Sequence, residues 1–90
     1  MKVFKYTLSV VEWQVLPLPK GARLLTVQMQ HGQVQLWALV DPSAPFESWT
    51  FRTVGTGNEA GDLSKDVYVG TYQIDHGALV FHVFAQQETP

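Results

Sequence analysis

The stretch "RLLTVQMQHGQVQLWALV", residues 23–40, decides the fold class of this chain. Apolar and polar side chains alternate on both sides of the central "HGQ", and a period of two places such side chains on opposite faces of a β-strand. A short glycine-containing segment between two alternating runs is typical of a β-hairpin. We expect one face of the hairpin to be buried, with the core-facing residues Leu25, Val27, Met29, Val34, Leu36, Ala38 and Val40.

The same alternation recurs on both sides of the hairpin, over residues 3–8, 11–15, 47–54, 66–74 and 77–85. The prolines of "PLPKGA", residues 17–22, are expected to end the second strand, because proline lacks the amide hydrogen that a ladder needs. A candidate helical turn at residues 58–66 is short and interrupted by glycine. The sequence therefore predicts one all-β domain over residues 1–90, a small antiparallel barrel or sandwich of six to seven strands with little or no helix.

The chain is rich in apolar residues for its length. Of its 90 residues, 46% are hydrophobic, 12% are aromatic and 16% are charged. A domain of this size hides only about 60 to 65% of the surface that its unfolded chain exposes. We therefore expect a homo-oligomer in which other copies cover the surplus aromatic rings. The segment 77–85 is apolar on both faces, and we expect it to lie either between two sheets or against another subunit.

Charge and cysteine content exclude several classes of protein. The net charge is -2 and the six Lys and Arg residues are scattered, so the basic face that duplex nucleic acid requires is not expected. The chain has no cysteine, which excludes a disulfide scaffold and a thiolate metal site. No apolar stretch approaches the roughly 20 residues that span a bilayer, and no signal-peptide pattern opens the chain. We expect a soluble intracellular protein without a membrane partner.

The stretch "FRTVGTGNEAGD", residues 51–62, is the strongest candidate for a binding site. Its glycine spacing differs from that of the dinucleotide fingerprint and of the P-loop. Glycines with positive φ can turn successive amide hydrogens towards one anion, and Arg52 or Lys65 can supply positive charge. The alternative is a surface turn without a ligand. The candidate ligand-binding residues of this stretch are Arg52, Gly55, Thr56, Gly57 and Asn58.

Two side chains outside the loop are further candidates for ligand contact. His82 is a lone polar residue on an apolar strand face, where we expect either a hydrogen-bonded core or interface histidine, or a ligand contact or pH sensor. Trp37 faces away from the apolar side of its hairpin, so its ring is open to stacking on a base. The spacing of His31, His76 and His82 matches no zinc pattern, and we expect no metal site and no cofactor.

The chain carries no local signature of catalysis. No two carboxylates occupy the same strand face at i and i+2, where an acid and a base would be held together. The serines lack the G-x-S-x-G pattern of an activated nucleophile. We therefore predict that the protein is not an enzyme and has no catalytic residue.

Four segments together carry a resemblance to a known group of proteins. They are "LWALVDP" (36–42), "FRTVGTG" (51–57), "YVGTYQ" (68–73) and "GALVFHVF" (77–84). In this order they resemble a family of short uncharacterised proteins encoded by bacteriophages and prophages, in which "LPKGARLLTVQMQHGQ" looks like the usual start of the central hairpin. A histidine often stands in that family where this chain has Asn58, so no catalytic or metal role is carried over to this position.

The resemblance implies a phage accessory protein that acts by binding in the host cytoplasm, often against a host defence. In one mechanism an oligomer encloses a small nucleotide-type ligand, with aromatic rings on the base and Arg52 with the loop amides on the phosphate. In the other, exposed aromatic side chains block a host enzyme and the loop only connects two strands. A third expectation is a small structural or assembly protein of the virion.

Overall fold

The structure, a computed structural model, describes residues 1–88 and consists of seven β-strands and one short 3₁₀ turn. The elements in chain order are β1 (Lys2–Leu8), β2 (Trp13–Pro19), β3 (Arg23–Gln30), β4 (Gln33–Val40), β5 (Phe46–Gly55), β6 (Val67–Ile74), η1 (Asp75–Gly77) and β7 (Leu79–Gln87). All strand pairs are antiparallel. The predicted all-β fold is confirmed, and residues 58–66 form no helix.

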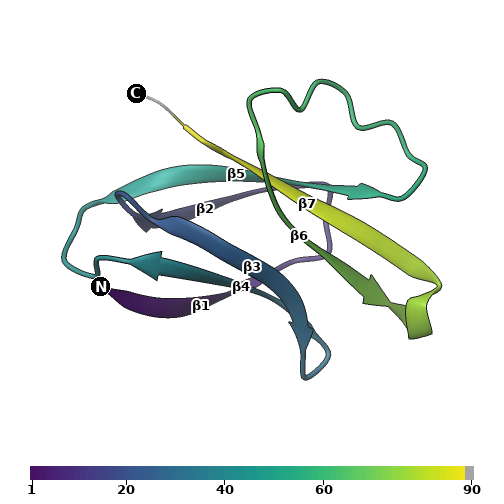
Figure 1. The fold of residues 1–90 in the computed structure, drawn as a ribbon, viewed down its shortest axis with the longest axis horizontal. Helices are drawn as coiled ribbons and strands as arrows, with labels where there is room; N and C mark the ends of the chain where they lie inside the picture. The colour runs from purple at the N-terminus through teal and green to yellow at the C-terminus, as the bar shows by residue number, and fades with distance from the viewer. Residues whose placement is uncertain (89–90) are drawn as a thin grey trace.

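The strands form two sheets that pack as a sandwich (Figure 1). A three-stranded sheet has the order β1-β4-β3, and a four-stranded sheet has the order β2-β5-β7-β6. The shortest extent of the molecule is 16 Å, which leaves room for two layers spaced about 10 Å apart. Of the two predicted architectures, the sandwich is therefore the one that forms, and the sheets do not close into a barrel.

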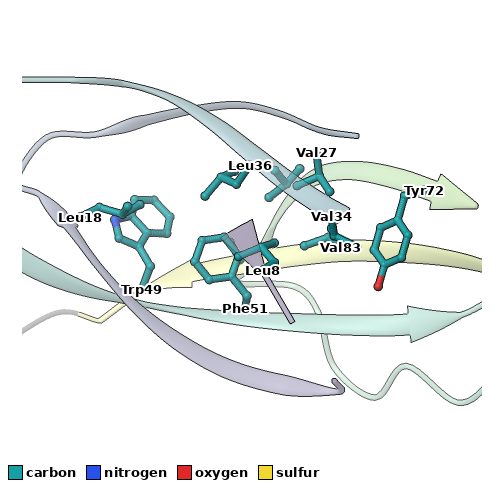
Figure 2. Packing of buried hydrophobic residues seen from close by; sticks show 11 residues of the cluster. Leu8, Leu18, Val27, Val34, Leu36, Trp49, Phe51, Tyr72 and Val83 are labelled. Atoms are coloured by element: carbon teal, nitrogen blue, oxygen red, sulfur yellow. The ribbon is translucent and has the colours of Figure 1, made fainter. Parts of the chain in front are cut away.

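The core lies between the two sheets (Figure 2). Phe51 of β5 and Leu36 of β4 are both fully buried and contribute from opposite layers. Burying a side chain of this size stabilises the fold by about 1.5 to 3 kcal/mol. The expected core-facing residues of β4 are confirmed, since the buried set contains Val34, Leu36, Ala38 and Val40.

The two sheets meet closely along one side, where β3 lies beside β6. A methyl group on Gly70 of β6 would lie 2.9 Å from both the backbone nitrogen and the backbone oxygen of Val27 in β3. Only glycine permits so close an approach of two backbones. The pairing register of β6 with β7 shifts between Tyr68 and Gly70, so the close contact lies next to an irregularity of the strand. The sandwich is therefore closed along the β3 and β6 side.

The prediction that "PLPKGA" ends the second strand is confirmed, since β2 ends at Pro19 and a turn follows at Lys20 and Gly21, but the expectation that the prolines themselves break the strand was wrong. β2 continues through Pro17, which pairs with Ser48, and ends at Pro19. β2 is the edge strand of its sheet, and a proline whose nitrogen faces away from the neighbouring strand removes no ladder hydrogen bond. The position of the strand within the sheet, which is not visible locally in the sequence, decides whether proline is tolerated.

The prediction that Leu25 faces the core was also wrong. The register between β3 and β4 shifts between Leu24 and Thr26, so Leu25 is the extra residue of a β-bulge. Leu25 is 44% exposed, whereas Leu24 packs against the core. Beyond the bulge the predicted alternation is restored, and Val27 is buried and Met29 packs against the core.

Substitution of Gly70 by alanine tests the closed side of the sandwich. The added methyl group collides with the Val27 backbone, which cannot rotate away as a side chain would. We expect Gly70→Ala to lower the free energy of unfolding by about 1 to 3 kcal/mol, measured by urea denaturation. The exposed neighbour Gln73 provides the control, because Gln73→Ala is expected to stay within about 0.5 kcal/mol of the wild type. Equal stability of the Gly70→Ala variant would show that the strands are not in close contact.

Candidate functional site

One row of side chains crosses the outer face of the four-stranded sheet, the face that points away from the three-stranded sheet. The strand register places Trp13 opposite Arg52, Arg52 opposite Phe84, and Phe84 opposite Tyr68. The Arg52 guanidinium carbon lies 4.9 Å from the centre of the Trp13 ring, a cation–π contact. The Phe84 and Tyr68 rings are 5.6 Å apart at a tilted angle. All four strands thus contribute to one row.

The glycine loop, residues 56–66, forms a wide arc between the end of β5 and the start of β6 (Figure 1), and two of its carbonyls lie within reach of Arg52 on the outer face of this sheet. Arg52 holds it there, because its guanidinium donates hydrogen bonds to the backbone carbonyls of Ala60 and Glu59. The same guanidinium lies 3.7 Å from the Glu12 carboxylate. The Arg52 side chain is only 14% exposed. Its charge is therefore engaged by groups of the chain itself.

A second attachment holds the start of the loop through His82 of β7. Thr56 Oγ1 lies 2.7 Å from His82 Nε2, and Thr71 Oγ1 of β6 lies 3.0 Å from His82 Nδ1. The hydroxyl groups of Tyr68 and Thr71 are also hydrogen-bonded. Both ring nitrogens of His82 thus have hydroxyl partners, and a hydroxyl can donate or accept as either tautomer requires. These contacts tie the loop to β6 and β7.

The turn that opens the glycine loop uses its amides internally. The Asn58 amide donates to the Gly55 carbonyl at 3.0 Å, and Gly57 has a φ of 86°, as position three of a type II turn requires. The Thr56 amide donates to the Val80 carbonyl at 3.1 Å. Two of the backbone amides that the sequence suggested as anion ligands therefore already donate hydrogen bonds within the chain.

Most of the predicted ligand-binding residues do converge. The loop and the sheet form a shallow, open hollow of about 250 Å³ that is lined by Val54, Gly55, Thr56, Gly57, Asn58, Ala60, Leu63, His82 and Phe84. Arg52 lies next to this lining, where it binds the Ala60 carbonyl. The structure does not bring Trp37 to the site, because Trp37 belongs to β4 in the other sheet and pairs with Lys5 and Thr26.

Sequence reasoning missed the apolar wall of the hollow, formed by Val54, Leu63 and Phe84. The alternation of side chains along the strands could have identified two of these residues. Val54 follows Arg52 at i+2 and Phe84 follows His82 at i+2, so each shares a strand face with a predicted site residue. Leu63 comes from the loop, where no periodicity predicts the direction of a side chain. The half-buried outer face of β7 is covered here by the loop.

The Asp62 carboxyl in the glycine loop is held by groups of the same loop. The backbone amide and the hydroxyl of Ser64 donate hydrogen bonds to the Asp62 carboxyl and hold its pKa below the ordinary value. This turn shapes the far end of the loop.

Among residues 1–88, no group of three His, Asp or Glu side chains converges as a metal site would require. In the same range, no helix is long and apolar enough to cross a membrane.

The fold and the site define a class of protein, an all-β sandwich with a loop folded over the outer face of one sheet. The chain belongs to the family described as Domain of unknown function (DUF7352), whose model matches residues 1–90. Comparisons with curated proteins and with solved structures found no match. The resemblance to phage proteins stays a prediction. The function has to be argued from the site.

Replacing Arg52 tests whether its side chain holds the loop. Arg52→Ala removes the bonds to the Glu59 and Ala60 carbonyls, and we expect a loss of about 1.5 to 3 kcal/mol in the free energy of unfolding, as for hydrogen bonds to charged groups. We also expect faster hydrogen exchange of the Asn58 and Asp66 amides, measured by NMR. Lys65→Ala, at an exposed loop position, is the control and leaves both quantities unchanged. Wild-type exchange rates in Arg52→Ala would contradict this role.

Proposed function

We propose that the protein acts by binding a small ligand, without catalysis, in the hollow between the glycine loop and the outer face of the four-stranded sheet. The observation that carries this proposal is the convergence of three segments on one open hollow. The loop contributes Leu63, β5 contributes Val54, and β7 contributes His82 and Phe84. Ligand sites of this kind combine apolar walls with a few polar groups that fix orientation.

The chemistry of the lining favours a flat, heteroaromatic ligand group of the nucleobase type. Phe84 offers a ring for contact, while Val54 and Leu63 complete the apolar wall. The Asn58 side chain offers an amide donor and a carbonyl acceptor to the polar edge of such a ring, while the His82 nitrogens are bonded to the Thr56 and Thr71 hydroxyls and fix the shape of the wall. The volume of about 250 Å³ lies just below the range of roughly 300 to 1,000 Å³ for drug-sized ligands, so the hollow suits a small ring system.

Under this proposal, Arg52 fixes the wall of the site and any phosphate group stays outside the hollow. The guanidinium already contacts two loop carbonyls and the Glu12 carboxylate. Recruiting it to a phosphate would release the loop that forms the site. The amides of Thr56 and Asn58 are likewise bonded to carbonyls. Recognition of a nucleotide-type ligand would therefore come from its base.

The biological setting that we propose rests on the motif resemblance alone. In that setting the protein is a phage accessory protein in the host cytoplasm, and it counteracts a host defence by sequestering a small nucleotide-type signal. The hollow beneath the loop is the part of the molecule that would hold the signal's base.

Titration calorimetry with the four ribonucleosides and their 5′-monophosphates tests the proposal. We expect binding of at least one nucleoside and an affinity for its monophosphate within about threefold, because the base carries the recognition. Leu63→Trp fills the hollow and is expected to weaken binding at least about tenfold, equivalent to about 1.4 kcal/mol. Val15→Trp adds the same ring to an exposed site on β2 and is the control. No heat with any of the eight compounds, or binding unaffected by Leu63→Trp, would remove the proposal.

A protein-binding function is the second candidate, favoured by an exposed apolar stripe on β2 and the start of β5. Trp13, Val15 and Phe46 are 56%, 59% and 73% exposed, and Pro17 lies between them on the same face. Pro17 and Pro19 remove two backbone donors from the edge of β2, so a partner would contact the stripe face-on and not extend the sheet. Exposed aromatic side chains of this kind are frequent hot spots of interfaces.

The stripe is tested by affinity purification from host cells with the wild type and with a Phe46→Ser variant. The second candidate expects one host enzyme at a one-to-one ratio with the wild type, inhibited by the purified protein and lost with Phe46→Ser. Thr50→Ala, on the same sheet face, serves as the folded control. A host enzyme captured equally by both variants, or none captured, would exclude the stripe.

A further inference from the structure

The two sheets have four edge strands, and one of them is free to accept another strand. The edges are β1 and β3 in one sheet and β2 and β6 in the other. β3 and β6 lie against each other. β2 carries Pro17 and Pro19, which cannot donate to a ladder. Among residues 1–88, β1 pairs only with β4, and its seven residues contain no proline. Its outer backbone groups are open to pairing.

We propose that β1 pairs antiparallel with β1 of a second copy of this chain, so that two three-stranded sheets join into one six-stranded sheet. Its strand order would be β3-β4-β1-β1-β4-β3, with a two-fold axis between the two β1 strands. Such an interface is isologous, because the same strand serves on both sides. Main-chain hydrogen bonds supply the affinity, as in other cases of strand addition. This proposal does not depend on the ligand site.

The two lysines of β1, Lys2 and Lys5, restrict the register of this pairing. A two-fold axis perpendicular to the sheet pairs residues of the same parity, since directly opposite side chains share a face. With Phe4 opposite itself, Lys2 lies opposite Tyr6 and Val3 lies opposite Lys5, so no like charges meet. A register centred on Lys5 would place two lysines directly opposite each other, which is unfavourable. Among the registers that keep the lysines apart, we assign the one centred on Phe4, because it places the two partly exposed Phe4 rings opposite each other.

The burial of β1 supports a missing neighbour at this edge. Phe4 pairs with Ala38, which is fully buried, so Phe4 lies on the core side of the sheet, and yet it is 38% exposed. The opposite sheet does not cover it at this point. In the Phe4 register, the two Phe4 rings lie side by side and cover each other. Cross-strand aromatic pairs of this kind stabilise a sheet.

Lys5 does not block the edge in this structure. Its ammonium reaches across β4 and donates a hydrogen bond of 2.9 Å to Gln30 of β3, away from the free edge. This hydrogen bond is exposed and therefore weak, so Lys5 can exchange it for an acidic partner across the new interface. Val3, which lies opposite Lys5 of the second copy, is 55% exposed and tolerates charge without loss of the fold.

Two substitutions of Val3 with opposite charge test the proposal by sedimentation equilibrium of the full chain. The wild type is expected to dimerise reversibly. The Val3→Glu substitution places a carboxylate opposite Lys5 of the second copy, twice per dimer, and is expected to tighten the dimer several-fold. The Val3→Lys substitution places a like charge there and is expected to weaken the dimer several-fold. Val67→Glu and Val67→Lys, at an exposed position on β6, are the controls and leave the dimer unchanged.

Hydrogen exchange of the β1 amides gives the second readout. Alternate β1 amides, those that face away from β4, are expected to gain protection as the protein concentration rises. A monomer at every concentration, with all β1 edge amides exchanging freely, would overturn the proposal. It would show that Lys2 and Lys5 prevent β1 from pairing with another strand. A dimer that responds identically to both charges at position 3 would place the interface elsewhere.

Discussion

The contact of the Arg52 guanidinium with the Glu59 and Ala60 carbonyls is the interaction on which the site depends. Without it, the glycine loop would be an exposed connection between β5 and β6. With it, the loop becomes one wall of a shallow apolar hollow, and Val54 and Phe84 line the other side. The ring of Trp13 and the carboxylate of Glu12 also contact the cation and offset part of its desolvation, while its buried Nε has no hydrogen-bond partner. The binding function that we propose follows from this one arrangement.

The thinness of the sandwich explains why both faces and edges are available for binding. Two layers within 16 Å bury a small core and leave two wide outer faces. One outer face carries the loop and the aromatic row, while the other is rich in polar side chains such as Gln28 and Gln30 of β3, which pair with Gln35 and Gln33 of β4. The backbone contact at Gly70 closes one side and leaves β1 open on the other. The proposed ligand site and the proposed dimer interface therefore lie in separate parts of the molecule.

The alternation of side chains was sufficient to predict the strands, because it reports directly on which face is buried. It failed where the backbone departs from regular geometry. The bulge at Leu25 turns that side chain outward, and the edge position of β2 permits Pro17 within a strand. Thr56 and His82, both candidates from the sequence, are in contact in the fold. The partners of Arg52 are backbone carbonyls eight and seven residues further on, which residue types cannot reveal. Trp37 was misplaced because the sequence does not say which strands share a sheet.

The central claim is that the glycine loop is a fixed wall and not a mobile connection. Backbone NMR order parameters for residues 56–66 of the wild-type protein, measured without ligand, test it most directly. The contacts of Arg52, Thr56 and Asn58 predict values of about 0.8 or higher, close to the roughly 0.85 of a rigid backbone. Values below about 0.6 throughout the loop, as in flexible segments, would contradict the account.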